Sequence, residues 1–90
     1  MIERRTLTEH STNAYLFVEN ILTENKKYAL TKEEIYAELP KDERGIPYIT
    51  IGSLETALRG LCRARVIEAH YVRGVRHFMI AEEQRGDYRG

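Results

Sequence analysis

The sequence predicts a single α+β domain, mostly helical, in which three helices precede a C-terminal β-hairpin. Apolar residues recur at the helical period of about 3.6 residues in three separate stretches before residue 65. After that point apolar and polar residues alternate at the strand period on both sides of Arg73-Gly74. A change from helical to strand periodicity within a few residues favours a helix presented beside a hairpin.

Length and composition allow one modest hydrophobic core. The 90 residues are 42% hydrophobic and show no change of composition that would divide the chain into two domains. We expect a loose N-terminal segment over 1–10, one domain over 11–83 and a flexible tail over 84–90. The single cysteine, Cys62, excludes an internal disulfide and is too little for a structural zinc site.

Several classes of protein are disfavoured by what the sequence lacks. No apolar run approaches the ~18 residues of a membrane span, and the first residues lack the apolar region of a secretory signal, so we expect a cytoplasmic protein. There is no Gly-rich phosphate loop, nucleophile elbow or zinc-protease motif. His70 and His77 have no clear third ligand. We therefore predict no enzyme activity, no metal and no cofactor.

The first helix is expected to begin at Ser11-Thr12-Asn13, a cluster of good N-cap residues, and to run to about Asn25. Its apolar stripe consists of Ala14, Tyr15, Phe17, Val18, Ile21 and Leu22. Leu16 falls on the polar side of this helix. A single exposed leucine is common on protein surfaces, but it can also belong to a contact between subunits.

The second helix is indicated by Thr31 and Glu34, which have the spacing of a capping box. It must stop at Leu39, because Pro40 disfavours helical geometry in the residue before it. Residues 40–48 contain two prolines and one glycine and are interpreted as a loop. This loop is long for a helix-turn-helix motif, in which the turn has about 3–4 residues.

The third helix should be capped by Thr50 or Ser53 and run to about Ala64, burying Leu54, Ala57, Leu58 and Leu61. Its outward face carries Gly52, Thr56, Arg59 and Arg63, flanked by Ser53, Glu55 and Gly60. Hydroxyl groups can bond phosphates or base edges, and arginine can contact guanine or the backbone. The alternative is an ordinary solvated helix face, on which Glu55 would repel phosphate.

The hairpin is expected to pair residues 66–72 with residues 75–80. A two-residue loop would put one set on the core face: Ile67, Ala69, Tyr71, Phe78 and Ile80. A three-residue loop with Gly74 in the left-handed region would slip the register. In either case Arg73 at the tip and Arg76 beside it can reach a phosphate.

The charge is unevenly distributed along a chain that is neutral overall. The sequence has 14 Lys plus Arg and 14 Asp plus Glu. Residues 50–80 contain five arginines and two glutamates, a net charge of +3, which leaves −3 for the remainder. One face of the folded domain is therefore expected to be basic.

Residues 28–30 (YAL), between the first and second predicted helices, are short and extended in character. The resulting order of helix, short strand, helix, helix and hairpin resembles the winged helix-turn-helix domain of small prokaryotic transcription regulators. Residues 51–61 (IGSLETALRGL) look like its recognition helix, 65–68 (RVIE) like the turn into the wing, and 78–80 (FMI) like the closing strand. The resemblance implies that the third helix enters the major groove and that the wing contacts the adjacent backbone. The residues expected to bind DNA are Thr50, Ser53, Thr56, Arg59, Arg63, Arg73 and Arg76.

We therefore expect a domain that binds duplex DNA and acts as a small transcription regulator. A chromosomal protein and a viral or plasmid protein can both have this role. One recognition helix reads only a few base pairs, so useful specificity favours a homodimer on a two-fold site. Whether a small-molecule effector binds is not encoded in any pattern of the sequence. The alternative is a winged helix that docks a protein in a replication, partition or regulatory assembly, for which the zero net charge is the main support.

Overall fold

The fold is α+β, with three helices and one three-stranded antiparallel sheet. A computed structural model describes the backbone of residues 4–81 and the side chains of residues 13–81. The elements are α1 (Arg4–Glu24), β1 (Leu30–Thr31), α2 (Lys32–Glu38), α3 (Ile51–Arg63), β2 (Ile67–Val72) and β3 (Val75–Ile80). This architecture is compatible with a winged helix.

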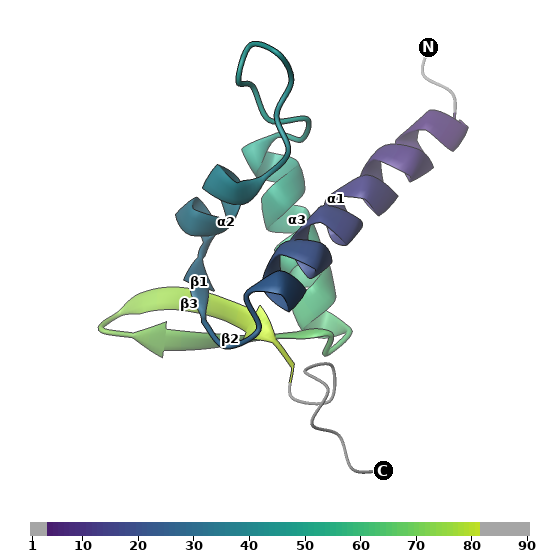
Figure 1. Ribbon diagram of the computed structural model, residues 1–90. Coiled ribbons are helices and arrows are strands. Elements are labelled where there is room, and N and C mark those ends of the chain that lie inside the picture. The colour runs from purple at the N-terminus through teal and green to yellow at the C-terminus, as the bar shows by residue number, and fades with distance from the viewer. Residues whose placement is uncertain (1–3, 82–90) are drawn as a thin grey trace.

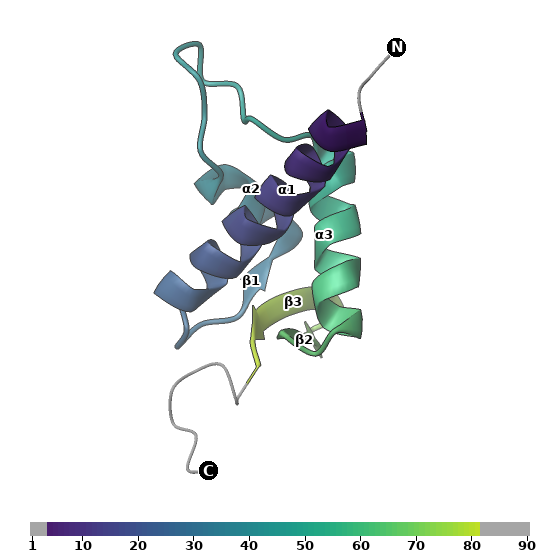
Figure 2. The same ribbon diagram turned by 90° about the vertical axis from the view of Figure 1, so that its right-hand side faces the viewer.

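The helices pack above the sheet, and the hairpin β2–β3 projects away from them (Figure 1). In the sheet β3 lies between β1 and β2. Figure 2 shows α1 crossing α3, which it contacts along the core. The core has contributions from α1, α2, α3, β2 and β3. Its largest side chains with at most 2% exposure are Val18, Leu22, Ile35, Leu39, Leu54, Ile67 and Ile80.

Helix α1 begins at Arg4, so the predicted start at Ser11-Thr12-Asn13 is wrong. Residues 4–10 contain no proline or glycine, and nothing in them prevents helical backbone from continuing upstream of the expected cap. The segment expected to be loose thus includes helical backbone from Arg4 onwards. The predicted tail over 84–90 lies outside the described residues. The C-terminal end is close to the prediction, because the Asn25 amide donates to the Ile21 carbonyl (3.1 Å).

Helix α2 begins and ends as predicted. The Glu34 amide donates to Thr31 Oγ1 (3.1 Å), and the Thr31 amide donates to Glu34 Oε1 (2.8 Å), which completes the capping box. Leu39 has extended backbone angles, as the residue before Pro40 requires. Two unpaired donors at the helix start are thereby satisfied by local side chains alone.

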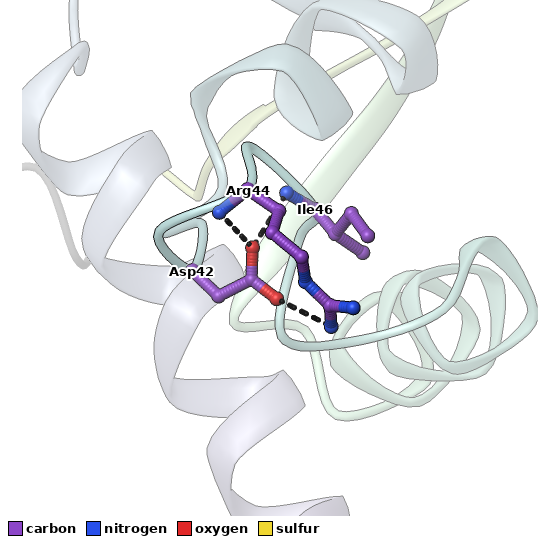
Figure 3. A network of polar contacts seen from close by, with 3 residues as sticks. All are labelled: Asp42, Arg44 and Ile46. Carbon is purple, nitrogen blue, oxygen red and sulfur yellow. Dashed lines mark hydrogen bonds and ion pairs between the residues drawn. The ribbon is translucent and has the colours of Figure 1, made fainter.

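The loop between α2 and α3 is organised around one carboxylate. Asp42 Oδ1 accepts hydrogen bonds from the amides of Arg44 (2.9 Å) and Ile46 (3.0 Å), and Oδ2 pairs with Arg44 Nη2 (3.3 Å) (Figure 3). An isolated bridge joins Lys41 to Pro47 across the same turn. The hydrogen bond from Ile46, with those from Arg44, lowers the pKa of Asp42. The loop lies at the opposite end of the helices from the hairpin (Figure 1).

Helix α3 is capped by Thr50, and a residue in the left-handed conformation follows its C-terminal end. Arg65 has φ +64°, its amide donates to the Cys62 carbonyl (3.0 Å), and the Val66 amide donates to the Leu61 carbonyl (3.0 Å). These two bonds form a Schellman motif, which turns the chain into β2.

The hairpin has the two-residue loop. Ile67 pairs with Ile80 and Ala69 with Phe78, and the loop residues Arg73 and Gly74 both have positive φ (54° and 79°). Positive φ at both positions is typical of a type I′ turn. The three-residue alternative is therefore wrong.

One residue of the expected core face is not in the core. Tyr71 pairs with Arg76, and 72% of its surface is exposed. It shares a face with the buried Ile67 and Phe78, but it lies near the end of a hairpin that extends beyond the helices (Figure 1). The alternation of apolar and polar residues therefore predicted correctly on which side of the sheet Tyr71 lies, but the prediction that Tyr71 is buried was wrong.

Candidate nucleic-acid interface

The predicted DNA-binding residues are all exposed. They lie on α3, at its N-cap and in the β2–β3 hairpin. They are Thr50, Ser53, Thr56, Arg59 and Arg63 at and along α3, and Arg73 and Arg76 in the hairpin. Exposure makes these side chains accessible to a partner. Their local environments differ, and those differences decide what each can do.

The two hydroxyl residues at the start of α3 serve the helix cap. Thr50 Oγ1 accepts a hydrogen bond from the Ser53 amide (3.0 Å) and donates one to Ser53 Oγ (3.2 Å). The Thr50 hydroxyl thus satisfies one of the free donors of the first turn. Ser53 Oγ accepts in this pair, which leaves its hydrogen available for a phosphate oxygen.

A cleft of about 610 Å³ lies between the start of α2, the middle of α3 and the outer half of the hairpin. Arg59 from α3 and Arg76 from β3 both line it, although the end of α3 and the whole of β2 lie between them along the chain. Leu58 and Phe78 contribute apolar surface. The fold therefore brings two of the predicted arginines to one concave surface.

The cleft also contains Lys32, which sequence reasoning did not single out. Lys32 Nζ lies 2.6 Å from Glu55 Oε2, and this ion pair joins the first turn of α2 to α3. The side-chain hydrogen bond and charge of Glu55 raise the pKa of Lys32, and Lys32 in turn lowers the pKa of Glu55. Both groups are therefore ionised at neutral pH, and the charge of Glu55 on α3 is offset.

No local signal could have revealed this pair. Lys32 and Glu55 are 23 positions apart, and each lies at an ordinary surface position of its own helix. Only the packing of α2 against α3 places them together. From the sequence we expected Glu55 to repel phosphate. The structure places the positive charge of Lys32 at hydrogen-bond distance from Glu55, and this charge reduces that repulsion.

Arg76 is held against the sheet by an aromatic ring. Its guanidinium carbon lies 5.1 Å from the centre of the Phe78 ring, within range of a cation–π interaction. Cys62 lies near the same arginine, but burial raises the pKa of this half-buried thiol, with the positive charge of Arg76 as the opposing influence. Cys62 is therefore a packing residue with little thiolate character.

Arg63 and Arg73 lie outside the cleft. Arg63 is in the last turn of α3, and Arg73 occupies the tip of the hairpin. Positive charge consequently extends from the end of the helix, through Arg59 and Arg76, to the tip of the hairpin. Such a spread suits an extended anionic partner better than a small one.

Within residues 4–81, no helix is both long and apolar enough to cross a bilayer. Among the side chains of residues 13–81, no group of three or more His, Cys, Asp or Glu is placed to bind a metal. No protein-family model matches the sequence, and no characterised protein matches it either. Conclusions about function therefore depend on the geometry of the interface.

Proposed function

We propose that this protein is a winged-helix domain that binds duplex DNA sequence-specifically, in the role of a small transcription regulator. In this proposal α3 enters the major groove and the β2–β3 wing contacts the adjacent backbone. The observation that carries it is that Arg59 of α3 and Arg76 of the wing line one cleft. Two cations from different elements on one concave surface can hold the phosphates of a single strand.

The dimensions of α3 support this placement. Its 13 residues make a helix about 20 Å long, which fits the major groove. Beside Ile51 and Glu55, its exposed face carries small, hydroxyl and arginine side chains, which allow close approach and polar contact with base edges. The order of the helices and strands, with β3 between β1 and β2, is compatible with the winged-helix arrangement.

The test is fluorescence anisotropy of a random duplex pool at low and near-physiological salt. Four contacts from Arg59, Arg63, Arg73 and Arg76 to phosphates would give a slope of log affinity against log salt of about −3.6. We expect micromolar binding that weakens steeply with salt. No binding at low salt would contradict the proposal.

Variants separate the roles of the arginines. Arg76→Gln and Arg73→Asn should weaken binding to all sequences equally and reduce the salt slope by about 1 each; asparagine tolerates the positive φ at position 73. Arg59→Gln should also relax sequence preference. Arg44→Gln, an exposed arginine in the α2–α3 loop, makes the same charge change away from the cleft and should have little effect.

The second candidate is a winged helix that docks a protein. It is favoured by the zero net charge and by apolar side chains exposed near the hairpin tip, namely Tyr71, Val72 and Val75. An apolar protein interface should be comparatively insensitive to salt. If the protein fails to bind duplex DNA at every salt concentration, the protein-docking candidate is favoured over the first.

We further propose a homodimer on two-fold DNA sites, with Leu16 of α1 in the contact. Leu16 is 48% exposed, which suits an interface residue. Sedimentation at tens of micromolar should then show a species of twice the 10.5 kDa chain mass. A single 10.5 kDa species would contradict this part of the proposal.

A further inference from the structure

The Lys32–Glu55 ion pair places an ionised carboxylate on the surface that we propose to face DNA. Glu55 is exposed on α3, adjacent to Thr56 and one turn before Arg59, and it lines the cleft with Arg59 and Arg76. A carboxylate in this position repels phosphate and lowers affinity for duplex DNA of any sequence. Glu55 therefore does not contribute to general affinity for DNA, and another role must account for a carboxylate on this surface.

The geometry points to Glu55 as a specificity-determining residue that accepts a hydrogen bond from the amino group of cytosine in the major groove. This inference rests on the DNA-binding function proposed above. Glutamate is one of the side chains that read cytosine N4, because an ionised carboxylate is purely an acceptor. Guanine and thymine present acceptors at the corresponding position, so the same carboxylate disfavours them.

Lys32 has two effects that make this possible. Among the described residues, the hydrogen bond given to Glu55 engages Oε2, which leaves Oε1 as an acceptor for a base. The pair also anchors the carboxylate to α2, so that a flexible side chain loses less freedom when it binds a base. Lys32 is thus a positioning residue for Glu55, and its charge reduces the repulsion of nearby phosphates.

A neutral protein that discriminates by repulsion should bind non-specific DNA weakly. The biologically relevant quantity is the ratio of specific to non-specific affinity. Phosphate repulsion lowers both affinities, and the hydrogen bond to cytosine offsets that loss only at the preferred site, so the ratio rises. Glu55 therefore limits the binding that the arginines alone would give to any duplex.

The experiment is selection of binding sites from a random duplex pool with the full chain, followed by affinity measurements on the selected sites. For the unmodified protein we expect a position with a strong preference for cytosine. Glu55→Gln should change the preferred base at that position from cytosine to adenine, because glutamine pairs with adenine N6 and N7. Discrimination in favour of cytosine should fall by roughly 10-fold or more.

Glu33→Gln is the matched control. Glu33 lines the same cleft from α2, so its replacement removes the same charge without touching α3. It should raise affinity for all sequences modestly and leave the selected site unchanged. Glu55→Ala should lose the cytosine preference without gaining one for adenine, and Lys32→Met should weaken that preference while Glu55 remains. Thermal unfolding of each variant verifies that the fold is retained.

The outcomes separate the two proposals. A selected site that is the same for the unmodified protein, Glu55→Gln and Glu33→Gln would overturn the role of Glu55 and leave DNA binding intact. A uniform rise in affinity for Glu55→Gln, with no change of base, would do the same. Failure of the unmodified protein to bind any duplex would overturn both the proposed function and this inference.

Discussion

At the scale of single residues, Gly60 shows how closely α1 and α3 approach. A Cβ atom at this position would lie 2.4 Å from Tyr15 Oη and 2.8 Å from Tyr15 Cε1. Real contacts of a Cβ are essentially never this short, so any larger residue must displace the tyrosine ring. The half-buried Tyr15 packs against the core, which restricts that displacement.

We predict that Gly60→Ala lowers the free energy of unfolding by about 1 kcal/mol, because the overpacking exceeds the gain in helix propensity. Gly52→Ala in the same helix is the control, since its Cβ would meet nothing nearer than Thr50 Oγ1 at 3.8 Å. That variant should be unchanged or more stable by up to about 1 kcal/mol. Urea unfolding measures both. Equal stability of the two variants would contradict the close contact.

Arg65 is the second residue with a specific backbone requirement. It ends α3 with φ +64°, a conformation that costs an ordinary L-residue roughly 1–2 kcal/mol. Glycine adopts this conformation without a steric penalty but loses more entropy on folding. The strain that glycine would relieve is larger than the extra entropy that glycine would lose on folding.

Arg65→Gly should therefore raise the free energy of unfolding by about 0.5 kcal/mol. Arg63→Gly makes the same substitution two residues earlier, inside the helix. It should destabilise the protein by roughly 0.5–1 kcal/mol. Chemical denaturation would show opposite signs for the two variants if the left-handed turn is as described, and the same sign if it is not.

At the scale of elements, the loop between α2 and α3 behaves as a small structural unit of its own. The Asp42 carboxylate satisfies two amides of its own turn and pairs with Arg44 (Figure 3). A loop of this length would otherwise have many conformations to lose on folding. The ionised Asp42 side chain therefore contributes to the order of the loop, together with backbone hydrogen bonds such as those from the Asp42 amide to the Ile46 carbonyl and from the Gly45 amide to the Asp42 carbonyl (2.9 Å each).

This contribution predicts a pH effect on stability. The pKa of Asp42 is lowered in the folded protein by the hydrogen bonds from Ile46 and Arg44. Its contribution is therefore fully present above the pKa of the unfolded chain and is lost as the pH falls below about 4. Asp42→Ala should reduce stability at pH 7 and make the loss of stability at acid pH less steep.

Asp42→Asn is the control for charge, because the amide oxygen can still accept from both backbone amides. It should lose less stability than Asp42→Ala at pH 7 and show an equally shallow acid dependence. Urea midpoints between pH 3 and pH 7 measure both. An acid dependence in Asp42→Asn as steep as that of the unmodified protein would show that other carboxylates are responsible.

At the scale of the whole molecule, one small core holds every element together. Side chains from α1, α2, α3 and the sheet meet in a single cluster, and the described residues contain no buried polar or charged side chain. A domain of this size has only a few kcal/mol to lose before it unfolds. Stability therefore depends strongly on each large buried residue.

Two leucines of α1 provide a direct comparison. Leu22 has 0% exposure, and Leu16 has 48%. Leu22→Ala should lower the free energy of unfolding by about 2–5 kcal/mol, whereas Leu16→Ala should change it by less than about 0.5 kcal/mol. Thermal and urea unfolding at low protein concentration measure the difference. An effect of Leu16→Ala that appears only as the protein concentration rises is what the proposed subunit contact on α1 predicts, whereas a large effect at low concentration would contradict the exposure of Leu16.

Local patterns predicted the parts of the fold that depend on neighbours in sequence. The capping box at Thr31, the stop before Pro40 and the cap at Thr50 each involve atoms within four residues of one another. The alternation of β2 and β3 likewise predicted which side chains share a face. The start of α1 was missed, because a good cap sequence permits a helix to begin but does not force it to.

The sequence by itself determined the α+β class, the three helices, the hairpin and the arginines that α3 and the hairpin expose, because these follow from periodicity and short-range hydrogen bonds. Only the tertiary structure decided that Lys32 meets Glu55, that Arg59 and Arg76 share a cleft, and that Tyr71 is exposed. These features arise from the packing of α2 and the hairpin against α3. Such contacts join residues that are distant along the chain, and no local pattern encodes their geometry.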